Sequence, residues 1–247
     1  MKSNGSFLHH GLLYVLNRYL LPATCIFCGL PLTEARYWYG ANSDGICGGC
    51  RANLPFRSQT ERIKKLRDFD VAKINKEIPR YLLDINVVIA FDYNADLSKC
   101  VSAFKFHDLL AAARPLGQLL SQVLVSIDLP FEPTAIVPIP LHAKRWKSRG
   151  YNQAEEMARV ISVEHRLPLL PHLLRRERDT SRQSEIMDSV ERLANVKEAF
   201  VADAEVVDHK VILVDDIITT GATILAAAAA LFQRGCQSVV VLALAGG

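Results

Sequence analysis

Uncharged hydrophobic runs in the second half of the chain predict buried strands. They cover residues 135–141, 211–214 and 238–245, and "VVIAFDY" after Asn86 is a similar run. Runs that are apolar at every position are typical of strands in a parallel sheet that is buried on both faces. A further strand is predicted at Leu169–Leu174.

Helical patterns alternate with these runs. Residues 97–106 and 108–126 predict helices, an amphipathic pattern begins at Asn152, and an alanine-rich stretch ends at Gly235. The alternation of strands and helices predicts an α/β domain over residues 81–247, with a parallel sheet covered on both faces. Ligands of such sheets bind beyond the carboxyl ends of the strands.

The first third of the chain has a different pattern. Residues 7–20 predict an amphipathic helix that leads into a cysteine-containing module, which gives a predicted domain over residues 1–56. Residues 57–80 are charged, with an excess of Lys and Arg, and predict a helical connector or linker. This basic connector is a candidate nucleic-acid contact, and a solvated helix face is the alternative.

Composition narrows the classes of protein that fit. Of the 247 residues, 50% are hydrophobic and 22% are charged, which excludes wholesale disorder and suits one large domain with a small one. The formal net charge of +3 is too small to indicate nucleic-acid binding by overall electrostatics. His9, His10 and Asn17 interrupt the N-terminal hydrophobic stretch, which therefore fits neither a membrane span nor a signal peptide. We expect a cytoplasmic protein that is not integral to a membrane.

Four of the six cysteines form two CxxC pairs, Cys25 with Cys28 and Cys47 with Cys50. The spacing C-x2-C-x18-C-x2-C predicts a structural zinc site, because two such turns direct four thiolates at one ion and leave no position for water. A thioredoxin-like redox pair and four unrelated buried thiols are the alternatives. Gly29, Gly48 and Gly49 are expected to supply the backbone freedom that tight knuckles need. The remaining cysteines, Cys100 and Cys236, stand alone in apolar stretches.

The stretch "VILVDDIITTGAT" at 211–223 predicts a strand, a loop and the start of a helix. Unsatisfied amides at a helix N-terminus attract a phosphate, and a glycine allows it to approach closely. The residues that would form this cradle are Thr219, Thr220, Gly221, Ala222 and Thr223. Asp215 and Asp216 suit the vicinal hydroxyls of a ribose. The order of acids and cradle therefore matches a ribose 5-phosphate, whereas helix capping at a solvated turn is the alternative.

A basic segment follows the predicted strand at 135–141. It contains Lys144, Arg145, Lys147 and Arg149, and it precedes the amphipathic pattern that Asn152 and Gln153 open. Such a loop favours an anion, although most Lys and Arg residues of this kind are solvated surface charges.

The 211–223 stretch closely resembles the phosphoribosyl pyrophosphate signature of type I phosphoribosyltransferases. The resemblance implies that Asp215 and Asp216 hold the ribose hydroxyls, that Thr219 to Thr223 wrap the 5-phosphate, and that the basic loop contacts pyrophosphate. It also implies a lid over residues 173–201, with Arg178, Arg182 and Arg192 as its available cations.

The order of the cysteine module, "FKFH" at 104–107, "VPIPLHAKRWKSRGYNQAEEMA", "RDTSRQSEIMDSVERLANVKEAF" and the signature resembles the ComF family over nearly the whole chain. The mapped landmarks are Arg149, Gly150, Asn152, Gln153, Gln183, Arg192, Asn195 and Phe200, whereas Asp179 stands where a basic residue is expected. The resemblance implies a type I phosphoribosyltransferase fold preceded by a four-cysteine zinc module.

The family's association with natural competence implies a phosphoribosyltransferase that binds phosphoribosyl pyrophosphate with magnesium and serves the uptake and processing of transforming DNA. The acceptor is left open. The rival hypothesis is a single-stranded DNA-binding or regulatory module that uses the phosphoribosyl site only to sense its ligand. Single-stranded DNA and other competence proteins are the expected macromolecular partners.

Overall fold

The computed structural model describes residues 24–30, 32, 45–71, 78–93, 97–98, 112–177 and 199–246, with the backbone alone at 148–149. The chain divides into two units, Met1–Leu54 and Pro55–Gly247. The predicted helix at 7–20, nearly all of the predicted helix at 97–106 and the centre of the predicted lid, 178–198, lie outside the described residues. No helix among the described residues combines the length and hydrophobicity needed to cross a membrane.

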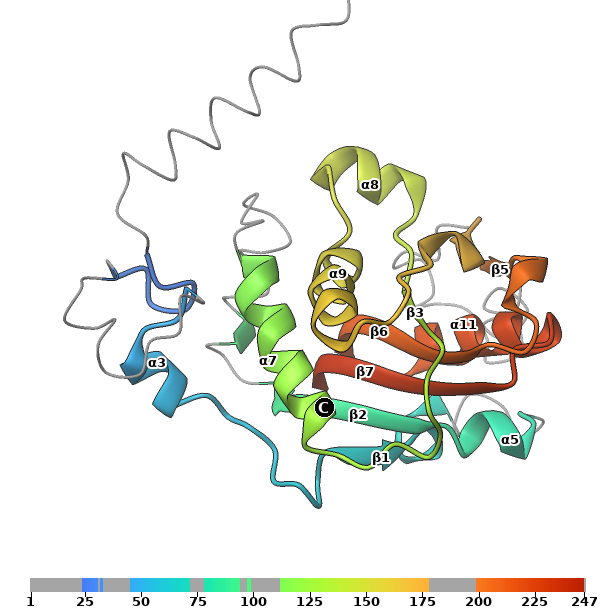
Figure 1. The fold of residues 1–247 in the computed structure, drawn as a ribbon, viewed down its shortest axis with the longest axis horizontal. Helices are drawn as coiled ribbons and strands as arrows, with labels where there is room; N and C mark the ends of the chain where they lie inside the picture. The colour runs from blue at the N-terminus through green and yellow to red at the C-terminus, as the bar shows by residue number, and fades with distance from the viewer. Residues whose placement is uncertain are drawn as a thin grey trace, which may run out of the picture. The chain divides into compact units, whose positions relative to one another are not determined.

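A five-stranded sheet organises the described part of the larger unit, in the order β1-β2-β7-β6-β3 (Figure 1). The strands are β1 (Ile63–Lys65), β2 (Asn86–Asp92), β3 (Ala135–Pro138), β6 (Lys210–Ile218) and β7 (Ser238–Gly246). Only β1 runs antiparallel to its neighbour, and the other pairs are parallel. β7 is buried at every position after its first, and β6 is buried over Val211–Val214, as their uninterrupted apolar runs predict.

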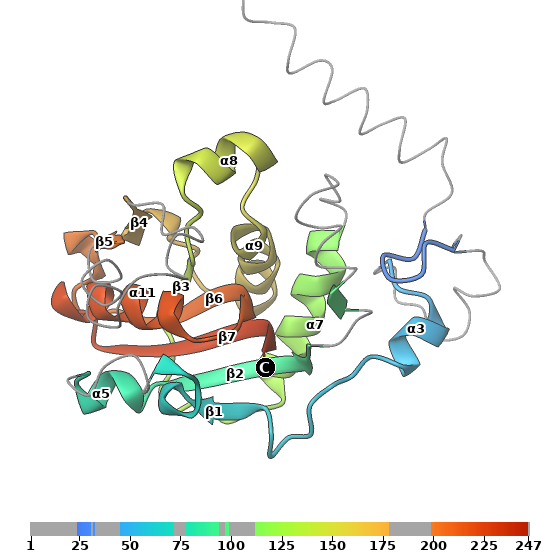
Figure 2. The same cartoon turned by 180° about the vertical axis from the view of Figure 1, so that it is seen from behind.

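Helices lie on both faces of this sheet (Figures 1 and 2). One face carries α7 (Ala113–Val125) and α9 (Gln153–His165), and the other carries α11 (Ala222–Gln233) and the short α5 (Arg80–Leu83). The first two helices pack closely at Gly117, where a Cβ atom would lie 2.7 Å from the Cβ of Val160. This arrangement leaves the carboxyl ends of β3 and β6 open for the segments that follow them.

A small antiparallel pair flanks the main sheet beyond β3. It consists of β4 (Leu174–Arg176) and β5 (Phe200–Ala202), and it is flanked by the 3-10 turns η3 (Pro171–Leu173) and η5 (Ala204–Val206). The strand predicted at Leu169–Leu174 is wrong for most of its length. Leu169 forms an isolated parallel bridge to Ile136, and Pro171 then begins a 3-10 turn because it has no amide hydrogen to continue a ladder.

The helical connector predicted at 57–80 is wrong for its first half. Residues 63–65 form β1, which pairs with β2, and Leu66–Asp68 forms the 3-10 turn η1. Leu66, Phe69 and Val71 are buried among the core residues of the larger unit. Charged residues stand between these apolar positions, so the sequence has no clear hydrophobic pattern that predicts their burial.

The basic segment after β3 is also not a loop, because Ala143–Arg149 forms helix α8. The helix begins after His142, whose ring Nδ1 accepts a hydrogen bond from the Lys144 amide at 3.3 Å, and it ends at Gly150, with φ of 76°. Figure 1 shows α8 set apart from the sheet, at the end of the segments that join it to β3 and α9.

Candidate functional site

The smaller unit brings together all four cysteines of the CxxC pairs. Their sulfur atoms lie within 4.8 Å of one another, and Cys28 Sγ lies 3.8 Å from Cys47 Sγ. Four sulfurs at a zinc–sulfur distance of about 2.3 Å stand about 3.8 Å apart in a tetrahedron, so this set fits a zinc ion. None of the described cysteines forms a disulfide. The cluster can therefore hold a metal such as zinc.

Backbone amides surround the sulfurs of this cluster. The Cys47 amide lies 3.4 Å from Cys25 Sγ, and the Cys50 amide lies 3.4 Å from Cys47 Sγ. Although burial opposes ionisation, hydrogen bonds from the amides of Cys47, Cys28 and Phe27 lower the pKa of Cys25 from 9.0 to about 7. Thiolates are the metal-binding form of cysteine, so these amides favour a bound cation.

The glycines of the knuckles divide into two groups. Gly29 has φ of 69°, and its amide donates to the Cys25 carbonyl, which closes the first knuckle as predicted. Gly48 and Gly49 instead begin helix α3 (Gly48–Ala52), so they do not supply left-handed backbone. Gly45, with φ of 73°, supplies it before the second pair. The second knuckle is thus the first turn of a helix capped by Cys47.

In the larger unit, the last third of β6 carries the acids that the sequence singles out. Asp215 and Asp216 are both half-buried. The Asp216 amide donates to Asp215 Oδ1 at 2.8 Å, and the Ile217 amide donates to Asp216 Oδ1 at 2.7 Å. One oxygen of each carboxylate is thereby fixed by the backbone that follows it.

The turn after β6 delivers the threonines to the start of α11. Thr219 and Thr220 are exposed, and Thr220 Oγ1 accepts a hydrogen bond from the Ala222 amide at 3.4 Å. Gly221 is the N-cap residue of α11, so its position offers no capping side chain to the first amides of the helix. Amides in that position are suited to an anion.

The structure explains why residue 221 is a glycine, and this explanation differs from the expected close approach of a phosphate. Its φ is 78°, and a Cβ atom there would lie 3.0 Å from Val71 Cγ1 and 3.2 Å from Leu66 Cδ1. The missing side chain therefore faces apolar residues under the turn. Glycine is needed at this position for the left-handed backbone and for packing.

The pairing of β3 with β6 brings the two predicted binding segments to one edge of the sheet. Pro138 lies opposite Val214, and the Ile139 amide donates to the Val214 carbonyl at 2.8 Å. Both strands then leave the sheet in the same direction, β3 toward α8 and β6 toward α11. Lys144 is exposed and Arg145 is half-buried on α8, whereas the Arg149 side chain lies outside the described residues.

Asn152 fixes the return from α8 to the sheet. Its side chain is buried, and its Nδ2 donates to the Ile139 carbonyl at 2.9 Å. Its Oδ1 accepts from the Ala154 amide at 3.2 Å, which caps α9. This landmark therefore ties the end of β3 to the start of α9.

Arg57 is a residue whose role sequence reasoning missed. It is only 6% exposed, its Nη2 donates to the Gly246 carbonyl at 2.7 Å, and its Nε lies 2.8 Å from Asp92 Oδ1. Gly246 is in register with Ile218, immediately before the threonine turn. Arg57 thus anchors the edge of the sheet where that turn begins, and no local sequence signal distinguishes it from the other basic residues of 57–80.

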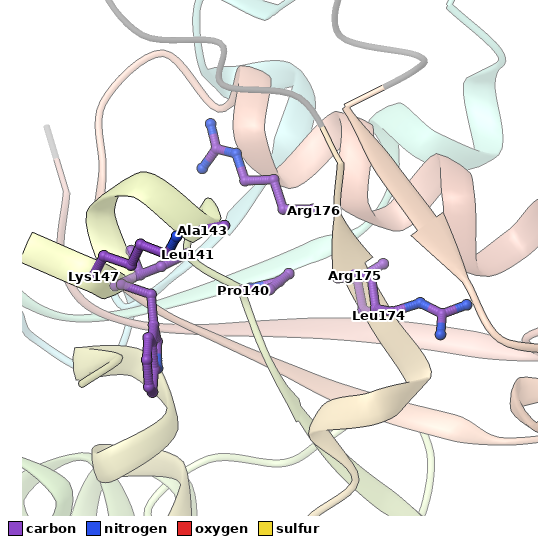
Figure 3. Close-up of a pocket in the computed structure, with 8 residues that line it drawn as sticks. Pro140, Leu141, Ala143, Lys147, Leu174, Arg175 and Arg176 are labelled. Carbon is purple, nitrogen blue, oxygen red and sulfur yellow. The ribbon is translucent and has the colours of Figure 1, made fainter. Parts of the chain in front are cut away.

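A pocket between α8 and β4 was also missed. Figure 3 shows its lining residues, which come from the segment after β3, from α8 and from β4. Trp146 within the basic segment was the available signal, because a large aromatic residue among charges is unusual for a merely solvated surface.

Comparisons with known proteins identify the larger unit. The model of the family "Phosphoribosyl transferase domain" matches residues 106–246, more than half of the chain. The allosteric regulatory enzyme of purine biosynthesis has a solved structure with 22% identity and a TM-score of 0.35, covering 52% of this chain and 24% of that chain.

Curated relatives cover both units. Competence protein F of Haemophilus influenzae is 29% identical over 231 residues, which are 90% of this chain and 96% of the relative. DNA utilization protein YhgH of Escherichia coli strain K12 is 28% identical over 234 residues, 91% and 97% of the two chains. Competence protein ComFC of Streptococcus pneumoniae is 29% identical over 154 residues, 62% of this chain and 65% of the relative.

The predicted fold class is confirmed: a mostly parallel α/β sheet of the type I phosphoribosyltransferase class follows a four-cysteine cluster. With its phosphoribosyl transferase domain and its competence-named relatives, this chain belongs to the phosphoribosyltransferase domain family and, within it, to the ComF family.

Proposed function

We propose that this protein binds phosphoribosyl pyrophosphate with magnesium at the carboxyl ends of β3 and β6 and transfers the phosphoribosyl group to an acceptor. The observation that supports this most strongly is the pair Asp215 and Asp216, which lies near the end of β6 and is followed by a threonine turn that leads into the glycine-capped start of α11. The acids are separated along the chain from the first amides of α11. This separation suits a sugar that carries its hydroxyls at one end and its 5-phosphate at the other.

The acids are suited to the ribose because each keeps a carboxylate oxygen oriented by a backbone amide. A carboxylate can accept a hydrogen bond from a hydroxyl through its remaining lone pairs. Asp215 and Asp216 would accept from the ribose 2- and 3-hydroxyls. Their charges would repel a phosphate, which is therefore directed to the amides beyond them.

The 5-phosphate would occupy the turn formed by Thr219, Thr220, Gly221, Ala222 and Thr223. Exposed hydroxyls on Thr219 and Thr220 and the first amides of α11 can all donate to it. α11 has 12 residues, so its macrodipole adds a favourable field at this end.

The pyrophosphate would lie toward β3, where the chain enters α8. Lys144 and Arg145 are placed on the first turn of that helix, and Arg149 is at its end. Positive charge near the leaving group stabilises the charge that develops on it. These three residues remain predictions for pyrophosphate contacts.

Magnesium fits the donors at this edge of the sheet. The ion prefers oxygen ligands and usually keeps several water molecules, so it needs only one or two protein carboxylates. Asp215 and Asp216 are the carboxylates at the end of β6 that would hold it. When bound, the ion would neutralise charge on the pyrophosphate.

In the proposed reaction, a nitrogen of the acceptor forms a bond to C1 of the ribose while the bond from C1 to the pyrophosphate oxygen breaks. The electron pair leaves with pyrophosphate, and the nitrogen loses its proton. The residues of this chain position the sugar, fix its hydroxyls and stabilise the leaving group, and no side chain forms a covalent intermediate.

We also propose that the four-cysteine cluster holds zinc as a structural ion and that the protein acts in natural competence. Four thiolates complete the tetrahedron, which leaves no position for a reacting water. The role in uptake and processing of transforming DNA is supported by relatives named competence protein F, competence protein ComFC and DNA utilization protein YhgH.

Two measurements test the proposal. Calorimetry on the metal-loaded, full-length protein should detect heat on titration of phosphoribosyl pyrophosphate with magnesium, and an absence of heat contradicts the proposed site. Pyrophosphate release should then be followed with candidate bases and nucleotides as acceptors, with Asp216→Asn as the variant that abolishes it. Binding without release for every acceptor would favour a module that senses its ligand.

A further inference from the structure

A pocket of about 380 Å³ lies between α8 and β4 (Figure 3). Pro140, Leu141 and Leu174 provide apolar lining, and Leu174 is 1% exposed. None of the eight residues that line the pocket is acidic. Its volume is at the lower end of the range for small-molecule sites, which is about 300–1,000 Å³.

The charged lining residues differ in direction. Arg176 extends from β4 on the side that carries α8 in Figure 3, whereas Arg175 extends to the opposite side. Arg175 is within 4.0 Å of Asp203, so part of its charge is balanced there. Lys147 contributes an exposed ammonium group from α8. Lys147 and Arg176 are therefore the cations that line the pocket on the α8 side.

Arg176 is held in place by an aromatic ring. Its guanidinium carbon lies 5.3 Å from the centre of the Phe200 ring, and Phe200 is opposite Arg176 in the β4–β5 pair. Phe200 is itself 4% exposed. A guanidinium group that is already ordered loses less entropy when it binds a phosphate.

Trp146 completes the lining with a large aromatic side chain that is 55% exposed. An exposed indole ring that lines the same pocket as two cations offers a stacking surface for a planar aromatic ring, and the cations are partners for an anion. Nucleotides combine these two features in one molecule. Inorganic pyrophosphate carries the negative charge, but it has no aromatic ring that could stack on the indole.

We infer that this pocket binds a nucleotide, with the base stacked on Trp146 and the phosphate held by Lys147 and Arg176. The ligand is either a free mononucleotide or one nucleotide of a single strand of nucleic acid, because both present the same base and phosphate. The pocket shares α8 with the proposed pyrophosphate contacts, but its lining includes neither the β6–α11 turn nor Lys144, Arg145 and Arg149, so the inference names a further ligand beside the proposed phosphoribosyl site.

The fluorescence of Trp146 provides a direct test. The chain has two tryptophans, Trp38 and Trp146, so full-length Trp38→Phe protein reports on Trp146 alone. Titration with deoxythymidine monophosphate and with a short oligothymidylate should quench this emission. Tighter, salt-sensitive binding of the oligonucleotide identifies a strand as the ligand, whereas equal affinity per nucleotide identifies the free nucleotide. No quenching and no binding by either probe overturns the inference.

Matched variants locate the ligand. Trp146→Ala should weaken binding of the preferred probe at least about fivefold, and Trp146→Phe should restore most of the affinity. Arg176→Gln should weaken binding and reduce the dependence of the affinity on salt. Tyr81→Ala is the control, because Tyr81 is a similarly exposed aromatic residue, at 56%, outside the pocket. Unchanged affinity in folded Trp146→Ala protein overturns the inference, and thermal unfolding checks that each variant folds.

Competition separates this inference from the proposed function. Inorganic pyrophosphate should not displace the probe, and the Asp215→Asn, Asp216→Asn double variant should still bind it. Displacement by pyrophosphate would make the pocket a leaving-group site and overturn the inference. Conversely, Trp146→Ala should still give heat with phosphoribosyl pyrophosphate, so each site can fail without the other.

Discussion

The four-cysteine cluster and the β6–α11 turn both direct backbone amides toward negative charge, but they differ in where that charge comes from. In the cluster, the amides of Cys47 and Cys50 donate to sulfurs of the chain itself. At α11, the first amides follow a glycine N-cap and suit the phosphate of a ligand. Under the proposed function, the first region would be completed by folding around a cation, and the second only by binding its ligand.

This difference predicts which property each region controls. A closed metal site contributes its binding energy to folding, so its loss should affect stability. Loop carboxylates at an open site contribute to affinity and little to the core. Variants in the two regions should therefore separate the two properties.

The largest effect is expected for Cys25→Ser, which should release zinc and unfold the smaller unit. Apparent zinc binding energies in small domains are about 10–16 kcal/mol, and most of this is folding energy. Metal content by atomic emission and proteolysis of residues 1–54 measure the effect. Cys236→Ala is the control, because Cys236 lies outside the cluster. Retention of one zinc per chain in Cys25→Ser would contradict the closed-site interpretation.

For the open site, the double variant Asp215→Asn, Asp216→Asn should lose affinity for phosphoribosyl pyrophosphate by about 100-fold or more, since each charged hydrogen bond contributes about 1.5–3 kcal/mol. Asn can keep the backbone contacts made by Asp215 Oδ1 and Asp216 Oδ1. The midpoint of thermal unfolding should therefore stay within a few degrees of the wild type. A large drop in that midpoint would show that these acids support the fold.

Arg57→Ala should affect the sheet edge behind the open site. Removing Arg57 leaves the Gly246 carbonyl without its 2.7 Å donor and Asp92 without its cation. We expect the free energy of unfolding to fall by about 2–3 kcal/mol. This range already allows for the exposure of Asp92, because a solvated carboxylate loses less when its cation is removed. Denaturant unfolding measures this loss. Arg80→Ala is the control, because the Arg80 side chain is 88% exposed. Equal losses in the two variants would contradict the anchoring role.

Local sequence is enough to identify the features whose residues are close together in the chain. Within each CxxC pair, and within the acids followed by threonines, the functional side chains are a few positions apart, and the spacing predicts the chemistry. The buried strand at 211–214 is similarly apparent because parallel strands covered on both faces are continuously apolar.

Features that depend on distant partners could not be predicted in this way. Arg57 has its role because β7 ends beside it, 189 positions later in the sequence. The pocket at Trp146 requires β4, which is brought beside α8 only by folding. In 63–71, charged residues conceal Leu66, Phe69 and Val71, which pack beneath Gly221. The division into domains at 1–56, 57–80 and 81–247 stays a prediction.

Gly221→Ala should destabilise the protein less than Arg57→Ala does, and it distinguishes packing from ligand approach at the turn. A left-handed conformation costs a non-glycine residue about 1–2 kcal/mol, and the added Cβ would lie 3.0 Å from Val71 Cγ1. We expect the free energy of unfolding to fall by about 1–3 kcal/mol. The companion variant Val71→Ala, Gly221→Ala makes room for the new methyl group, so its loss should be smaller than the sum of the two single losses. Additive losses in denaturant unfolding would show that Val71 and the Gly221 position do not pack against each other.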